Sequence, residues 1–154
     1  MIDIHAHILP GVDDGSKNPS ETEKLLKLSW KQGVTEIIAT PHFSHHTDFA
    51  GLRERYEQTK KAAQRIDPRF KIYLGQEILY FEGMTDWLDQ GKALTLADSR
   101  YVLVEFRPGD NFIKLSRAVR ELVSAGYLPI VAHVERYDCL REKGRTAELI
   151  GLGA

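Results

Sequence analysis

The sequence predicts an α/β fold with a parallel sheet, of the (β/α) barrel type, and three observations support this prediction. Short apolar segments alternate with helical segments about five times along the chain. The apolar segments are apolar throughout, which is typical of parallel strands that helices cover on both faces. Histidines and acidic residues recur where these segments end, and in (β/α) barrels the active site is built at that rim.

The composition is that of an ordinary globular protein and excludes several functions. The chain has 154 residues, of which 42% are hydrophobic and 28% charged, and its net charge of −1 argues against binding to nucleic acid or to a membrane surface. No apolar run approaches the roughly 20 residues that span a bilayer, and no signal peptide precedes Met1. The single cysteine, Cys139, excludes an internal disulfide. We therefore expect a cytoplasmic protein with one domain.

The first half of the chain alternates between predicted strands and helices. Residues 2–5 form a short strand, and Ser20-Glu21-Thr22-Glu23 has the spacing of a capping box that begins a helix running to about Gln32. Gly33 follows in the position of a C-terminal cap. Residues 34–39 are rich in β-branched side chains, which predicts a second strand.

The remaining elements repeat this order. The expected helices cover residues 52–66, 84–90, 111–125 and 140–150, and the expected strands cover residues 71–74, 101–106 and 128–132. Asp67-Pro68 ends the first of these helices, because the residue before a proline avoids the helical conformation.

His5 and His7 are the first candidate metal ligands. Residues two apart in a strand project from the same face, so both imidazoles can reach one ion where the strand ends. Imidazole and carboxylate ligands suit zinc, manganese or iron. Asp13 and Asp14 follow closely, and we expect one of them to be a ligand and not both. The alternatives are a solvated strand end for the histidines and turn residues before a glycine for the aspartates.

Four further candidates lie at or just beyond the ends of later strands, namely His42, Glu77, Glu105 and His133. Glu105 interrupts an apolar strand, where an ionised carboxylate is costly unless it is paired or binds a metal. His42 and His133 each follow a predicted buried strand, and the alternative for both is a structural histidine. Glu77 is either a ligand or a hydrogen-bond acceptor for one.

Arg136 is the candidate anion-binding residue, since a guanidinium group can bind two phosphate oxygens at once. An ion pair with Glu135 or Asp138 is the equally supported alternative. Cys139 is not set in the glycine-rich phosphate-binding loop of a thiol phosphatase, so we expect it to be a small buried residue. His45 and His46 lie in a polar loop, where we expect them to be solvated.

At these residues the chain resembles the PHP (polymerase and histidinol phosphatase) superfamily, whose fold is a distorted seven-stranded (β/α) barrel. Within it, the chain is most similar to the bacterial metal-dependent tyrosine phosphatases encoded with capsule and exopolysaccharide genes. The resemblance runs along essentially the whole chain. The motifs that carry it are residues 1–7, 12–15, 39–42, 75–78 and 132–136.

The resemblance implies a phosphatase that binds two or three Mn²⁺ ions, with iron or zinc as alternatives. Arg136 would hold the substrate phosphate. The implied substrate is the phosphorylated C-terminal tyrosine cluster of a bacterial tyrosine autokinase that regulates capsular or exopolysaccharide synthesis. The implied metal ligands are His5, His7, Asp14, His42, Glu77, Glu105 and His133.

Two departures from the family pattern accompany the resemblance. Val134 replaces the usual proline, and the chain reaches Ala154 without the late Asp-x-His pair and about two further β/α units. We therefore expect residues 1–154 to be a single PHP-like domain that lacks its C-terminal portion, either a fragment or a degenerate natural form. Its open sheet edges and exposed apolar surface predict either poor stability or self-association into a homo-oligomer.

These departures leave two alternative functions open. One is a PHP phosphoesterase acting on a small phosphate ester such as histidinol phosphate. The other is a non-catalytic remnant that binds metal or an autokinase without turnover, which the missing Asp-x-His pair favours.

Overall fold

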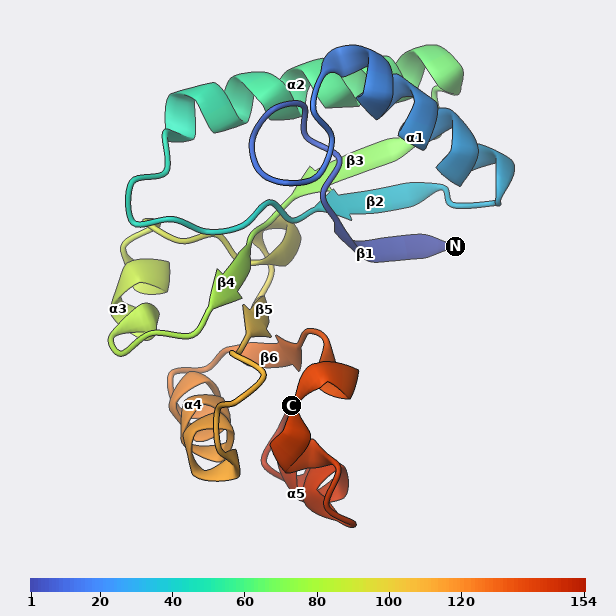
Figure 1. Ribbon diagram of the computed structural model, residues 1–154. Coiled ribbons are helices and arrows are strands. Elements are labelled where there is room, and N and C mark those ends of the chain that lie inside the picture. Colours follow the sequence, from blue (N-terminus) through green and yellow to red (C-terminus); the bar gives the residue numbers. More distant parts are fainter. The chain divides into compact units, whose positions relative to one another are not determined.

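The computed structural model describes residues 1–154, which divide into two compact units (Figure 1). The first unit comprises residues 1–76 and 96–98, and the second comprises residues 77–95 and 99–154. Each unit contains one three-stranded sheet in which all strand pairs are parallel. The prediction of an α/β fold with parallel sheets is confirmed.

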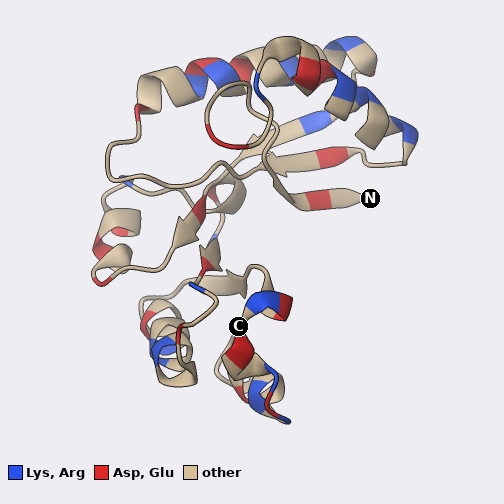
Figure 2. Ribbon diagram, viewed as in Figure 1, with Lys and Arg blue, Asp and Glu red and all other residues tan.

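The sheet of the first unit has the strand order β1 (Ile2–Ala6), β2 (Glu36–Ala39), β3 (Lys71–Leu74). Helices α1 (Pro19–Lys31) and α2 (Phe49–Ile66) lie along one face of it (Figure 1). Apolar side chains from the sheet and both helices form the core of this unit, including Leu26, Ile37, Ala63 and Phe70. Lys, Arg, Asp and Glu are mixed on the helices, so neither carries a field of one sign (Figure 2).

Helix α1 begins two residues earlier than the capping-box prediction. Asn18 is the N-cap, and its side-chain oxygen accepts a hydrogen bond from the backbone N–H of Glu21 at 3.0 Å. Pro19 occupies the first turn, where its missing N–H costs nothing. The Glu21 carboxylate accepts from the N–H of Lys17, the residue before the cap, and not from the cap residue as in a capping box. Ser20 is therefore a residue of the first turn and not the cap.

Helix α2 also begins earlier than predicted, at Phe49 instead of residue 52. Asp48 is the N-cap and accepts hydrogen bonds from two backbone N–H groups of the first turn, both at 3.1 Å. The helix ends before Asp67, as the following proline predicts. Gly33 after α1 has a φ of 86°, which confirms its predicted role after that helix.

The sheet of the second unit has the strand order β4 (Glu77–Leu79), β5 (Tyr101–Glu105), β6 (Leu128–Val131). The three residues of β4 were not predicted as a strand, because so short a segment has no visible pattern. The remaining elements are α3 (Met84–Asp89), α4 (Phe112–Ser124), α5 (Arg145–Gly151) and the 3₁₀ turns η1 (Leu96–Asp98, in the first unit), η2 (Val134–Arg136) and η3 (Asp138–Leu140).

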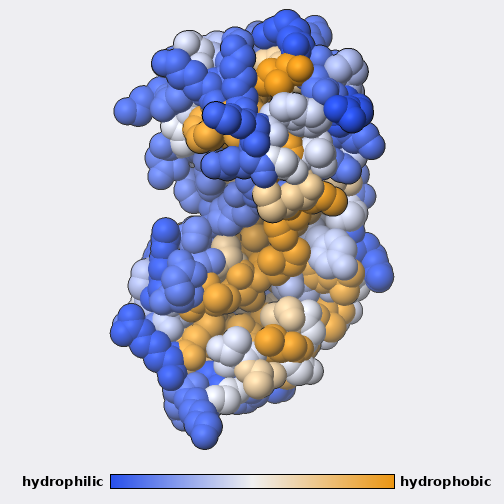
Figure 3. Space-filling model, turned by 90° about the vertical axis from the view of Figure 1, so that its right-hand side faces the viewer, coloured by the Kyte–Doolittle hydropathy of each residue, from blue (hydrophilic) through white to orange (hydrophobic).

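The strands number six instead of five, and their hydrogen bonds do not close a barrel. Strand β1 is an edge strand of its sheet, and its side chains Ile2 and Ile4 are exposed. The prediction that every strand is buried on both faces is therefore wrong for β1. Apolar side chains are also visible on the face drawn in Figure 3. None of the helices is long and apolar enough to span a membrane.

Candidate metal centre

The first unit brings four of the predicted ligands together. His5 lies on β1 and His7 just beyond it, and their Nε2 atoms are 3.2 Å apart. His42 follows β2, and its ring centroid is 4.6 Å from that of His7. The Asp14 carboxylate is 3.5 Å from Nε2 of His42. Potential ligand atoms of His7, Asp14 and His42 all lie within 4.8 Å of one another, which is close enough to share an ion.

Asp13 organises this cluster without being among the predicted ligands. Its Oδ2 accepts a hydrogen bond from Nδ1 of His7 at 2.7 Å and another from the backbone N–H of His42 at 3.1 Å. Burial alone raises the pKa of the Asp13 carboxyl, but the hydrogen bonds from His7, Gly15 and His42 together outweigh burial and lower it. The ionised carboxylate fixes the proton of a neutral His7 on Nδ1, which leaves the Nε2 lone pair for a metal.

The adjacent aspartates thus have different environments. The side chain of Asp13 is 7% exposed and that of Asp14 is 82% exposed. Asp14 stays a predicted ligand, and its exposure gives it the freedom to move toward an ion. The sequence singled out the Asp-Asp pair but not the role of Asp13, because a contact between Asp13 and His7 depends on how the loop folds back.

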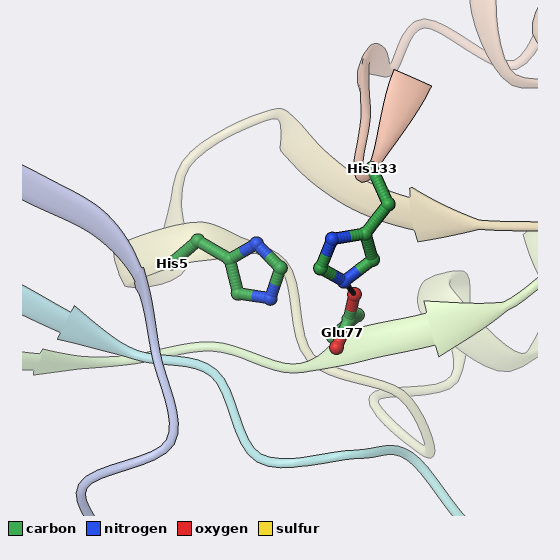
Figure 4. Close-up of side chains that lie close together, drawn as sticks. All are labelled: His5, Glu77 and His133. Carbon is green, nitrogen blue, oxygen red and sulfur yellow. Dashed lines mark ion pairs between the residues drawn. The ribbon is translucent and has the colours of Figure 1, made fainter. Parts of the chain in front are cut away.

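The second unit brings the other three predicted ligands together. Glu77 is the first residue of β4, Glu105 is the last residue of β5, and His133 lies two residues beyond β6. The Glu77 carboxylate is 2.9 Å from Nε2 of His133 (Figure 4), and carboxylate oxygens of Glu77 and Glu105 lie within 4.8 Å of each other. The sequence left open whether Glu77 is a metal ligand or only a hydrogen-bond acceptor for one. In the structure its side chain is completely buried, with 0% exposed.

The chemistry of both clusters fits divalent cations. Two carboxylates as close as Glu77 and Glu105 repel each other when ionised, and a bound cation removes that penalty. Together the units offer four imidazoles and three carboxylates among the predicted ligands, a mixture that suits manganese, iron or zinc.

The backbone at His133 supports a specialised role for this residue. His133 has φ 54° and ψ 37°, the left-handed conformation, which costs a residue with a Cβ about 1–2 kcal/mol. Non-glycine residues held in this region concentrate at functional sites.

The family of the chain follows from a comparison with known proteins. The family described as "Capsular polysaccharide synthesis, CpsB/CapC" matches the chain over residues 1–154. The chain belongs to the CpsB/CapC family.

Similar CpsB/CapC proteins include three curated relatives. The chain is 35% identical to "Tyrosine-protein phosphatase CpsB" of Streptococcus pneumoniae, an alignment that covers 99% of this chain and 65% of that protein. It is 34% identical to "Tyrosine-protein phosphatase YwqE" of Bacillus subtilis (strain 168), covering 92% and 57%. It is also 34% identical to "Putative tyrosine-protein phosphatase CapC" of Staphylococcus aureus, covering 88% and 54%. The chain thus spans 54% to 65% of the length of these relatives.

A solved CpsB/CapC structure confirms the predicted resemblance. The chain superposes with a TM-score of 0.87 and 32% identity on a chain from the crystal structures of YwqE from Bacillus subtilis and CpsB from Streptococcus pneumoniae, described as "unique metal-dependent tyrosine phosphatases". The match covers 100% of this chain and 64% of that chain. The fold class is therefore that of the metal-dependent tyrosine phosphatases of the PHP type.

In this CpsB/CapC chain Arg136 ends the 3₁₀ turn η2 that follows His133. Its Nε is 3.7 Å from Oε1 of Glu135, whereas Asp138 pairs with Arg141 at 3.4 Å. The structure therefore contains the predicted alternative pairing with Glu135. Both side chains of that pair are mostly exposed, so it is weak and leaves the guanidinium available to a phosphate group.

The remaining sequence candidates take no part in either cluster. Cys139 is half-buried and not fully buried as predicted, and burial raises the pKa of its thiol, which disfavours the thiolate that a nucleophile needs. His45 and His46 are exposed, and the ring of His45 lies against that of Phe43.

Gly15 provides a test of the loop that carries both aspartates. A Cβ at residue 15 would overlap the backbone carbonyl and the Cβ of His7. We expect Gly15→Ala to lower the free energy of unfolding by about 1–3 kcal/mol and to weaken Mn²⁺ binding, because His7 must shift. Gly109→Ala is the matched control, since a Cβ there meets nothing within 4 Å. Equal unfolding midpoints for the two variants in urea titrations would contradict this account.

Proposed function

We propose that this chain carries the metal centre of a protein-tyrosine phosphatase, a hydrolase that removes phosphate from phosphotyrosine. The observation that carries the proposal is the convergence of the seven predicted ligands into one cluster in each unit. The chain's similarity to proteins named tyrosine-protein phosphatases supports the reaction class. We also propose that residues 1–154 form a PHP-like domain.

The proposed cofactor is Mn²⁺, in two or three ions, with iron or zinc as alternatives. Bound divalent cations supply an activated water nucleophile and neutralise the phosphate charge. The proposed ligands are His5, His7, Asp14, His42, Glu77, Glu105 and His133.

The other residues of the site have separate roles in this proposal. The guanidinium of Arg136 binds non-bridging phosphate oxygens, for which its planar pair of donors is suited. The Asp13 carboxylate keeps the proton of His7 on Nδ1 and thereby directs Nε2 toward the metal. No side chain forms a covalent phosphate intermediate.

A cavity beside His42 supports a substrate larger than free phosphate. Its volume is about 310 Å³, at the lower end of the range for small-molecule sites. His42 lines it together with the apolar side chains of Pro41 and Leu52 and the basic side chain of Arg55. A phosphotyrosine substrate needs apolar contacts for its aromatic ring close to the metal that binds its phosphate. This cavity offers such contacts next to His42, a proposed metal ligand.

The proposed substrate is the phosphorylated C-terminal tyrosine cluster of a bacterial tyrosine autokinase, and the proposed role is regulation of capsule or exopolysaccharide synthesis in the cytoplasm. The description of the matching family as a capsular polysaccharide synthesis family supports this setting. The exposed apolar side chains of β1, an edge strand, support the further proposal of a homo-oligomer.

The test is a comparison of substrates by the Mn²⁺-loaded chain. We expect release of phosphate from a phosphotyrosyl peptide, little release from histidinol phosphate, and none from either after chelation. Preference for histidinol phosphate would replace the proposed substrate with a small ester. Stoichiometric Mn²⁺ without hydrolysis of any phosphate ester would show that the chain is a metal-binding remnant. Full-length CpsB of Streptococcus pneumoniae serves as the comparison protein for each assay.

A further inference from the structure

The side chain of Tyr137 occupies an unusual place between two strands of the second unit. The hydrogen-bond ladder between β5 and β6 runs up to the bond from the N–H of Ala132 to the carbonyl of Val104, at 2.9 Å. In a parallel ladder the next bond joins the N–H of Phe106 to the carbonyl of Ala132. Here the Tyr137 hydroxyl stands between these two groups. It accepts from the N–H of Phe106 at 3.1 Å and donates to the carbonyl of Ala132 at 2.6 Å.

The hydroxyl is held firmly in that place. Tyr137 is 1% exposed, and its ring packs edge-on against that of Phe106 with 6.0 Å between centroids. Burial raises the pKa of Tyr137, so the hydroxyl keeps the proton that it donates to Ala132. The side chain therefore acts as a fixed spacer that satisfies both backbone groups while keeping the strand ends apart.

The two backbone groups that it joins are next to predicted metal ligands. Glu105 directly precedes Phe106, and His133 directly follows Ala132. His133 has a left-handed backbone conformation, which is unfavourable for a residue with a Cβ and must be maintained by its surroundings. The bond from Tyr137 to Ala132 closes the short loop that contains both His133 and Arg136.

We propose that Tyr137 is a positioning residue, whose hydroxyl sets the separation of Glu105 and His133 and holds the loop between His133 and Arg136. Without the hydroxyl, the N–H of Phe106 and the carbonyl of Ala132 bond directly, and the strand ends move together. The link to metal binding rests on the proposed function, because it takes Glu105 and His133 as ligands.

The test compares Tyr137→Phe with Tyr80→Phe, which removes another hydrogen-bonded hydroxyl from the same unit. Tyr80 is also buried, and its hydroxyl donates to Glu121 at 2.7 Å. We expect both variants to lower the unfolding temperature to a similar extent. Titration calorimetry with Mn²⁺ should show a dissociation constant raised about tenfold in Tyr137→Phe and unchanged in Tyr80→Phe. Tenfold is the smallest loss of metal affinity typical when a residue that supports a ligand is removed. An equal effect on Mn²⁺ binding in both variants, or in neither, would overturn the proposal.

Crystal structures of the metal-free wild type and Tyr137→Phe test the same proposal without relying on metal binding. We expect a direct Phe106–Ala132 hydrogen bond in the variant, with Glu105 and His133 displaced. A water molecule in place of the hydroxyl, with both strand ends unmoved, would overturn the inference. Failure of the wild-type chain to bind Mn²⁺ would instead overturn the proposed function. The two metal-free structures would then still decide whether the Tyr137 hydroxyl sets the separation of the strand ends.

Discussion

Replacing Glu77 with glutamine is expected to weaken Mn²⁺ binding by more than about 100-fold, beyond the range for losing an outer-shell partner. The side chain of Glu77 is completely buried, lies 2.9 Å from His133 and has a carboxylate oxygen within 4.8 Å of Glu105. Glutamine keeps the size of the side chain and one oxygen but removes the charge that a cation needs. Metal content after dialysis and titration calorimetry with Mn²⁺ measure the loss.

The stability of the metal-free protein distinguishes a ligand from a structural residue. If Glu77 is a ligand, its negative charge destabilises the metal-free protein, since the charge is buried close to the Glu105 carboxylate. We therefore expect metal-free Glu77→Gln to unfold at or above the wild-type temperature and to lose the stabilisation that Mn²⁺ gives the wild type.

The control for this variant is Glu82→Gln, which removes an exposed carboxylate of the same unit that pairs with Arg117. We expect Mn²⁺ binding by Glu82→Gln to equal that of the wild type. Wild-type Mn²⁺ affinity in Glu77→Gln, or a large loss of metal-free stability in it, would show that Glu77 is a structural partner of His133.

The Arg136→Ala variant is expected to lose about 100- to 1,000-fold in kcat/KM toward a phosphotyrosyl peptide, the size of effect found when one donor to a developing anion is removed. The guanidinium ends η2, just beyond His133, and its exposed pair with Glu135 offers little competition to a phosphate group. Mn²⁺ content should stay at the wild-type level, because Arg136 carries no ligand atom for a cation. Initial rates together with metal analysis give both quantities.

Three further variants separate phosphate binding by Arg136 from an effect of its positive charge alone or of its ion pair. Arg136→Lys keeps the charge without the paired donors, so its kcat/KM should lie between those of wild type and Arg136→Ala. Arg141→Ala removes an exposed arginine that pairs with Asp138, and it should retain wild-type activity. Glu135→Ala should also retain activity. Full activity in Arg136→Ala would exclude the phosphate-binding role, and equal losses in Glu135→Ala would attribute the effect to the ion pair.

Local sequence signals predicted several elements well, and their errors have local causes. Helix α4 was expected over residues 111–125 and lies within them, because Asn111 caps it and Gly126 follows it with a φ of 88°. The start of α1 was misplaced because both Asn18 and Ser20 are residues that can cap a helix, and Pro19, which favours the first turn, makes Asn18 the cap. Strand β4 was missed because its pattern is only three residues long, and it is defined by pairing with β5.

The candidate site shows a similar division. The recurrence of histidines and acidic residues near strand ends singled out six of the seven proposed ligands, since parallel strands end at a common edge of their sheet, and the family resemblance selected Asp14. Glu77 proved to begin β4, and metal binding by these residues stays a prediction. The sequence could not assign Asp13 its hydrogen bond to His7, nor distinguish it from the exposed Asp14. The complete burial of Glu77 and the place of the Tyr137 hydroxyl were equally invisible, because each depends on contacts between residues far apart in the chain.

The sequence by itself determined the α/β class, the parallel strands, the family and the residue types available for metal binding. These properties follow from local periodicity and from short motifs whose residues are neighbours in the chain. Only the tertiary structure decided the division into two units, the exposure of β1, the tautomer that Asp13 imposes on His7 and the insertion of Tyr137 between β5 and β6. Burial and hydrogen-bond partners are properties of the folded chain, so no local pattern of residues specifies them.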